Sequence, residues 1–215
     1  MRIGLVLVLA LSVWGLQAQA AERGQQTEDS KHVKTWNQFA DKLLAVHEQV
    51  ISTHKVKETT RLGHYRNDPP FYKEHTYHDV KTGKLLSSIQ WEIDNPKNLH
   101  VLELFLYDDQ NRRTRDYTVA FLPGFRNAPS QTVVTLYGYN GKLTAFRNFD
   151  ASGEVIYESC DGDLNGQYVQ LSFEDYEIEN LRSNPKGVGG SAEYKACFDA
   201  IPLDAIQAKA LPPSL

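Results

Sequence analysis

The sequence has few of the residues and motifs that mark chemistry. It contains two cysteines and one methionine in 215 residues. It has no Cys-x-x-Cys, no Gly-x-Ser-x-Gly, no His-Glu-x-x-His and no glycine-rich phosphate loop. Those motifs carry redox, nucleophilic, zinc-dependent and nucleotide chemistry. We therefore expect a protein that is not an enzyme.

Basic residues are also in the minority. The chain has 23 Lys and Arg against 27 Asp and Glu, a formal net charge of -4. Binding to nucleic acid needs a surface rich in Lys and Arg, because the ligand is a chain of phosphates. The one basic group, Arg112 to Arg115, lies beside Asp108, Asp109 and Asp116 and is typical of a solvated hairpin end. We expect no nucleic-acid partner.

The N-terminal segment has the pattern of an export signal. Arg2 precedes an apolar run from Ile3 to Leu16, and Ala18-Gln19-Ala20 is the small-x-small pattern before a cleavage site. The run is shorter than the roughly 20 residues that span a bilayer. No Asn-x-Ser/Thr sequon occurs in the chain, which favours a bacterial periplasmic protein over a eukaryotic secreted one. We predict a signal peptide over 1–20, a periplasmic or secreted location, and no integral membrane segment after cleavage.

A polar leader over 21–32 precedes one strong helical pattern. Apolar residues recur at spacings of three and four from Val33 to Ile51, and Ser30 is a suitable N-cap. A lone helix of this length is marginal in water, so its apolar stripe must pack on another element.

That element is predicted to be a sheet. From Lys55 to Phe173, runs of β-branched and aromatic residues alternate with turn sequences such as Asn140-Gly141 and Asn165-Gly166. The turns are spaced by roughly 10 to 14 residues, which leaves no room for crossover helices. We predict a mainly β (α+β) fold over 33–183: an antiparallel β-meander or half-open barrel backed by one long N-terminal helix. The segment 99–107 is apolar on both faces, and we expect the helix to cover it.

The two cysteines lie far apart in the sequence. In an exported chain, Cys160 and Cys197 most often form one structural disulfide, although two free thiols or a bond to a partner are alternatives. The bond would tie residues 184–215, a Gly-rich linker and C-terminal tail, back to the sheet. We expect 184–191 to be mobile and a short helix over 202–210.

Residues 136–173 read LYGYNGKLTAFRNFDASGEVIYESCDGDLNGQYVQLSF. A glycine turn followed by an aromatic strand recurs after 12 and then 13 residues, at Gly141, Gly153 and Gly166. This segment resembles MORN-type and YD-type β-hairpin repeats. The resemblance implies a stacked hairpin sheet used for binding or scaffolding, with no catalytic residues. Residues 55–135 do not keep the period.

The layout of signal, helix and meander is also similar to that of periplasmic lipoprotein-carrier proteins, in which a half-open barrel holds acyl chains.

Two groups of residues are candidate metal ligands. The first residues of a calcium-binding loop are matched by Asp161, Asp163 and Asn165, with Gly166 at the sixth position. The twelfth position, where such a loop needs a Glu to complete the site, is Ser172. A hairpin turn explains the same residues. His64, His75 and His78 form the densest histidine group, but alternation along a strand places His75 and His78 on opposite faces. Apart from this possible calcium ion, we expect no cofactor.

Paired carboxylates are the remaining catalytic candidates. Glu92 with Glu103, or the acidic run 174–177, could serve sugar chemistry, although acidic residues on hairpins are more often solvated.

The leading hypothesis is an exported interaction or scaffold module that binds a protein or cell-envelope partner. The alternatives are a carrier of an apolar ligand and a metal-dependent enzyme. A carrier needs a dry pocket lined by apolar side chains, whereas a scaffold has a filled core and exposed aromatic residues.

Overall fold

The structure is a computed structural model that describes residues 30–66, 68–123, 126–184 and 186–203. The predicted signal peptide, most of the polar leader and most of the predicted helix over 202–210 lie outside these residues. The long helix α2 (Ser30–Thr53) comes first, as predicted. The described residues include no helix long and apolar enough to cross a membrane.

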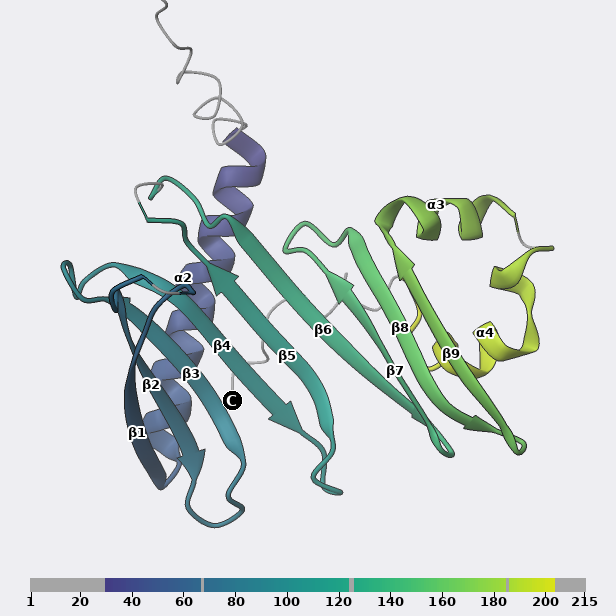
Figure 1. Ribbon diagram of the computed structural model, residues 1–215, viewed down its shortest axis with the longest axis horizontal. Helices are drawn as coiled ribbons and strands as arrows, with labels where there is room; N and C mark the ends of the chain where they lie inside the picture. The colour runs from purple at the N-terminus through teal and green to yellow at the C-terminus, as the bar shows by residue number, and fades with distance from the viewer. Residues whose placement is uncertain (1–29, 67, 124–125, 185, 204–215) are drawn as a thin grey trace, which may run out of the picture.

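Nine strands follow α2, and each pairs antiparallel with its neighbours in sequence. The sheet is therefore a simple meander and is not closed, which confirms the predicted fold class (Figure 1). The strands are β1 (Val56–Gly63), β2 (Tyr72–Asp79), β3 (Leu85–Glu92), β4 (Leu99–Tyr107), β5 (Arg113–Ala120), β6 (Gln131–Asn140), β7 (Leu143–Phe149), β8 (Val155–Leu164) and β9 (Gln167–Glu174).

One face of the sheet, called here the helix face, carries the core. Seen in Figure 1, α2 crosses behind the strands, and it contacts β4, β5 and β6. The ring of Phe39 on α2 lies 6.3 Å from that of Tyr117 on β5, and Leu43 is fully buried. Apolar side chains that alternate along the strands meet the stripe of the helix, and this match explains why α2 lies where it does.

Strand β4 departs from its predicted surroundings. Its even-numbered residues Leu102 and Leu104 are fully buried on the helix face, as expected. Its odd-numbered residues point to the other face, where the described chain places no helix. Phe105 is nevertheless only 8% exposed, and the guanidinium of Arg113 lies 4.6 Å from its ring centre. Side chains of the sheet itself cover this second face, which sequence alternation alone does not reveal.

Three short helical elements end the described chain: α3 (Asp175–Ser183), the 3-10 turn η1 (Val188–Gly190) and α4 (Ala192–Phe198). Helix α3 begins at a capping box in which Glu174 and Glu177 each accept a bond from the other's backbone N–H. No helix was predicted here, because the acidic run read as a solvated end of the sheet. Helix α4 packs on β6, β7 and β8, on the same face as α2.

Candidate binding face

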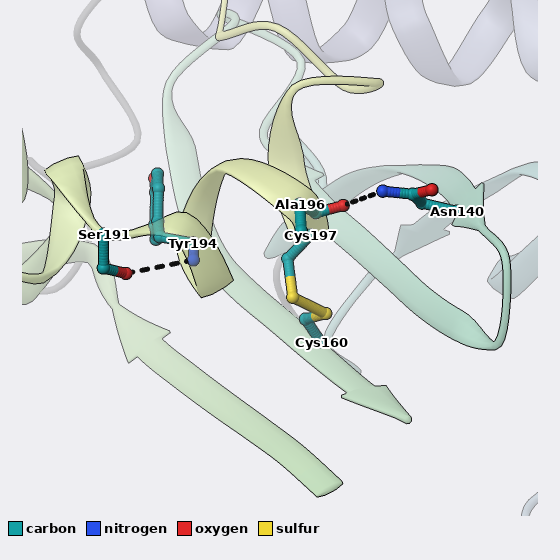
Figure 2. The surroundings of a disulfide bond; sticks show 6 residues. All are labelled: Asn140, Cys160, Ser191, Tyr194, Ala196 and Cys197. Carbon is teal, nitrogen blue, oxygen red and sulfur yellow. Dashed lines mark hydrogen bonds between the residues drawn. A yellow bond between two sulfur atoms is a disulfide. The ribbon is translucent and has the colours of Figure 1, made fainter. Parts of the chain in front are cut away.

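The predicted disulfide is present. Cys160 on β8 and Cys197 on α4 are bonded with a Cα–Cα distance of 5.9 Å, and both are buried (Figure 2). Ser191 caps α4 by accepting the backbone N–H of Tyr194 at 3.1 Å, and Asn140 donates to the carbonyl of Ala196 at 2.9 Å (Figure 2). The disulfide thus fastens the C-terminal segment to the sheet, as predicted, and it does so on the helix face.

The candidate calcium ligands form a hairpin. Asp161 and Asp163 belong to β8, and the two-residue turn Asn165-Gly166 leads into β9 with φ values of 55° and 86°. Positive φ at both turn residues is the geometry of a tight β-hairpin. Asp163 accepts the backbone N–H of Gly166 at 3.1 Å and so stabilises the turn. No group of three metal-ligating side chains occurs in the part of the chain that the structure describes. The calcium site stays a prediction.

The three histidines do not converge. His75 pairs with the buried Ile89, on the helix face, and its Nδ1 lies 2.6 Å from the carboxylate of Glu58. His78 lies on the opposite face and lines a hollow with Glu103. His64 follows the end of β1 and is exposed. The alternation that separates His75 from His78 is the one expected from the sequence, and the transition-metal site stays a prediction.

The candidate carboxylate pairs are also apart. Glu92 forms an ion pair with Arg126 and accepts a bond from Asn98 at 2.7 Å. Glu103 pairs with Ser88, four residues before Glu92 on β3, so the backbone positions of the two residues are about 13 Å apart along the strand. The acidic run after β9 caps α3. For Glu92 and Glu103 this backbone spacing is longer than the roughly 5 to 10 Å between the two carboxylates that glycoside hydrolysis uses.

The face opposite the helix face, called here the open face, carries a row of aromatic rings. Tyr137 on β6 and Phe146 on β7 are direct cross-strand partners with ring centres 5.9 Å apart. Tyr157 on β8 continues the row at 5.8 Å from Phe146. All three rings are partly exposed. Rings at this spacing form a continuous, partly apolar platform, in which neighbouring rings are tilted by 48° and 35°.

A buried carboxylate lies at the end of this platform. Asp116 on β5 is 8% exposed and accepts bonds from Tyr137 Oη at 2.7 Å and Arg113 Nη1 at 3.1 Å. Both bonds reach Oδ2, and Oδ1 is buried without a partner among the described residues. Burial raises the pKa of Asp116, although Tyr137 and Arg113 oppose this. Burial, together with the bond to Asp116, raises the pKa of Tyr137 to about 12.

A hollow of about 350 Å³ opens on the same face between β1 and β4. Glu103 and the well-bonded Glu74 both line it. Burial raises the pKa of Glu103, and the negative charges of Glu74 and Asp116 add to this. Burial alone would raise the pKa of Glu74, but hydrogen bonds from Arg61 and Gln90 outweigh it and lower the pKa. The open face therefore combines aromatic rings with carboxylates of different proton affinity.

No local sequence pattern predicts this face. Its members Asp116, Tyr137, Phe146 and Tyr157 are spread over 42 positions of the sequence and form no motif. Aromatic residues do occupy every second position in part of β6, at Tyr137 and Tyr139. Alternation could not show which side the helices would cover, because that depends on where α2 and α4 pack.

Comparison of the chain with family models, with characterised proteins and with solved structures finds no match.

Proposed function

We propose that this protein is a non-catalytic binding module of the cell envelope and that it binds its partner through the open face. The observation that carries the proposal is the partly exposed platform of Tyr137, Phe146 and Tyr157 on a sheet whose helices α2 and α4 both pack on the other side. Aromatic side chains supply large contact area at low cost in conformational entropy, and they are enriched in binding surfaces.

The filled helix face supports a binding module over an apolar carrier. Leu43, Leu102, Leu104, Tyr117 and Phe149 are all fully buried there, so α2 and the strands fill the space that an acyl chain would occupy. The hollow on the open face is lined by Glu74, Glu103 and Ser88. Two carboxylates in the lining disfavour an apolar ligand, because covering them would remove charged or polar groups from water.

The disulfide supports a location outside the cytoplasm, since such bonds persist in oxidising compartments. The separated carboxylates support a non-catalytic role, because Glu92 is neutralised by Arg126 while Glu103 lies far along the strand.

The proposal is tested with the exported protein and the insoluble envelope fraction of the producing cells. Phe146→Ser combined with Tyr157→Ser removes two rings of the platform and should reduce co-sedimentation by about tenfold or more, as loss of a central aromatic contact does. Tyr176→Ser is the matched control, because Tyr176 is 65% exposed but lies on α3. Equal binding of the double variant and the wild type would refute the proposal. A stoichiometric lipid recovered with the protein would favour the carrier instead.

A further inference from the structure

The hollow between β1 and β4 has a floor of small hydroxyl side chains that ends at a carboxylate. Thr59, Thr76, Ser88 and Glu103 are direct partners from strand to strand, so they form one continuous row across the open face. Thr59 Oγ1 and Thr76 Oγ1 lie 2.5 Å apart, and Ser88 is 4% exposed. The depression over this row, called here the polar hollow, measures about 350 Å³, within the roughly 300 to 1,000 Å³ of small-molecule sites.

Residues on either side of the row build the walls of the polar hollow. On one side, the buried Glu74 accepts a bond from Gln90 Nε2 at 2.9 Å and forms an ion pair with Arg61. On the other side, the register of β2 and β3 shifts immediately before His78, which then pairs with Leu85. Both of these side chains line the hollow, and such register shifts commonly redirect side chains beside binding sites. The walls are therefore in place before a ligand arrives.

Glu103 is the carboxylate in the hollow that lacks a counter-charge of its own. In the part of the chain that the structure describes, no group donates a hydrogen bond to it. Glu74, in contrast, is paired with Arg61. Asp116 is paired with Arg113. Burial and the negative charges of Glu74 and Asp116 raise the pKa of Glu103, and the charge of Arg113 offsets only part of this. A positively charged donor in the hollow would relieve this repulsion.

Few other charged groups face Glu103. The charged and titratable side chains around the hollow are, besides Glu103, those of Lys57, Arg61, Glu74, His78, Arg113 and Asp116. Strand β3 lines the hollow with uncharged residues, and helices α2 and α4 pack on the other face. Lys57 and Arg61 lie on β1, three strands from Glu103, which is a backbone distance of about 14 Å or more. The space next to the Glu103 carboxylate is thus open to a cation from outside.

From these observations we propose that the polar hollow binds a ligand through a primary ammonium group. An ammonium carries three donors and no acceptor, so it can meet the Glu103 carboxylate together with the hydroxyl oxygens of Thr76 and Ser88. A free alkylamine and a lysine side chain both present this group. The inference goes beyond the function proposed above, because the hollow lies on β1 to β4 and the aromatic platform on β6 to β8 (Figure 1).

The test is isothermal titration calorimetry of the exported protein with pentylamine, and with 1-pentanol as the uncharged comparison. We expect pentylamine to bind and pentanol not to bind. Glu103→Gln should lower the affinity for pentylamine by about tenfold or more, because the charged partner of the ammonium is lost. Asp161→Asn is the matched control and should bind like the wild type. It removes one exposed negative charge from the same face, on β8, four strands or about 19 Å from Glu103.

Two further measurements separate binding from stability and identify the source of the ammonium. Glu103→Gln removes a repelled charge, so urea denaturation should show it to be at least as stable as the wild type. Its weaker binding would then not reflect unfolding. Nα-acetyl-lysine N-methylamide presents the ammonium as a peptide does. If it binds like pentylamine, a lysine side chain is a sufficient ligand, and if only pentylamine binds, the ligand is a free amine. Both results support the inference.

The affinity should also fall as the pH is lowered from about 8 to about 5. Protonation of Glu103 removes its charge, whereas an alkylammonium stays charged throughout this range. Glu103→Gln should lose this dependence. Absence of pentylamine binding, equal binding of pentanol, or equal affinities of Glu103→Gln and Asp161→Asn would overturn the inference. Phe146→Ser with Tyr157→Ser should bind pentylamine like the wild type, so failure here is distinguishable from failure of the proposed function.

Discussion

Arg147 on β7 and Glu158 on β8 are direct cross-strand partners whose side chains form an ion pair inside the protein. Arg147 Nε lies 2.7 Å from Glu158 Oε1, and the side chains are 4% and 0% exposed. Arg147 also donates to the carbonyl of Ile201 and to Tyr194 Oη, which in turn donates to Glu158 Oε2 at 2.8 Å. Burial and the neighbouring Glu158 charge raise the pKa of Tyr194 to about 12. The pair therefore anchors the C-terminal segment independently of the disulfide.

Replacing one member of this pair should be costly. Glu158→Gln leaves the guanidinium of Arg147 buried without a counter-charge, and we expect a loss of about 3 kcal/mol or more in the free energy of unfolding, measured by urea denaturation. The double variant Arg147→Leu with Glu158→Leu removes both charges and should be more stable than Glu158→Gln. A Glu158→Gln protein as stable as the wild type would show that the pair is not an anchor.

Stability should fall as the pH drops toward 5 because of His47. This residue is 4% exposed, its Nδ1 lies 3.0 Å from Ser87 Oγ, and burial lowers its pKa from 6.5 to about 4. The unfolded chain takes up a proton below pH 6.5 while the folded chain does not, so the contribution is complete above pH 6.5 and decreases down to about pH 4.

Between pH 7.5 and 5.0 this single group should cost about 2 kcal/mol, measured by urea denaturation at both values. His47→Gln cannot take up the proton, so its stability should depend less on pH by about that amount. An unchanged pH dependence in His47→Gln would contradict the assignment, whatever the stability of that variant at pH 7.5.

Gly162 should not tolerate a side chain. Its φ is +139°, and a Cβ there would lie 2.2 Å from the carbonyl oxygen of Lys142. We expect Gly162→Ala to destabilise the protein by about 3 kcal/mol, because both the backbone conformation and the contact are unfavourable. Gly141→Ala is the control: its φ is +60° but nothing lies within 4 Å, so only about 1 kcal/mol should be lost. Thermal unfolding of the two variants compares them, and equal losses would mean that the Lys142 carbonyl moves aside.

The disulfide should contribute about 3 to 4 kcal/mol, because it closes a loop with a sequence separation of 37 residues in the unfolded chain. Cys160→Ser with Cys197→Ser should show this loss in urea denaturation. A reductant should lower the unfolding midpoint of the wild type and leave that of the double variant unchanged. Shifts of equal size in both proteins would mean that the reductant acts elsewhere.

The sequence predicted the architecture well because local signals agree with the final fold. The stripe from Val33 to Ile51, the Asn-Gly turns and the spacing between turns each depend on residues close together in the chain. A meander pairs only strands that are neighbours in sequence, so these signals also determine the sheet order. The disulfide followed from the presence of two cysteines in a chain with an export pattern.

The candidate sites were harder to predict because they depend on contacts between distant residues. The ring of Phe146 meets Tyr137 across one strand pair and Tyr157 across another. Helix α3 was not predicted from the sequence. Its capping residues Glu174 and Glu177 belong to an acidic run, and such a run is recognised as a helix cap only when the helix that follows is known. The calcium-like residues could not be judged from the sequence alone, because a tight hairpin turn and a calcium loop use the same residue types.

The sequential order of the nine strands also has a consequence for how the chain folds. Each strand finds its partner as soon as the next one is available, so the contact order of the sheet is low and no strand has to wait for a distant part of the chain. Pairing can proceed from β1 onward while the C-terminal residues are still emerging from a ribosome or a translocation channel. The bond from Cys160 to Cys197 and the contacts of Arg147 with Tyr194 and Ile201 require nearly the whole chain, so docking of the C-terminal segment is the step that completes folding.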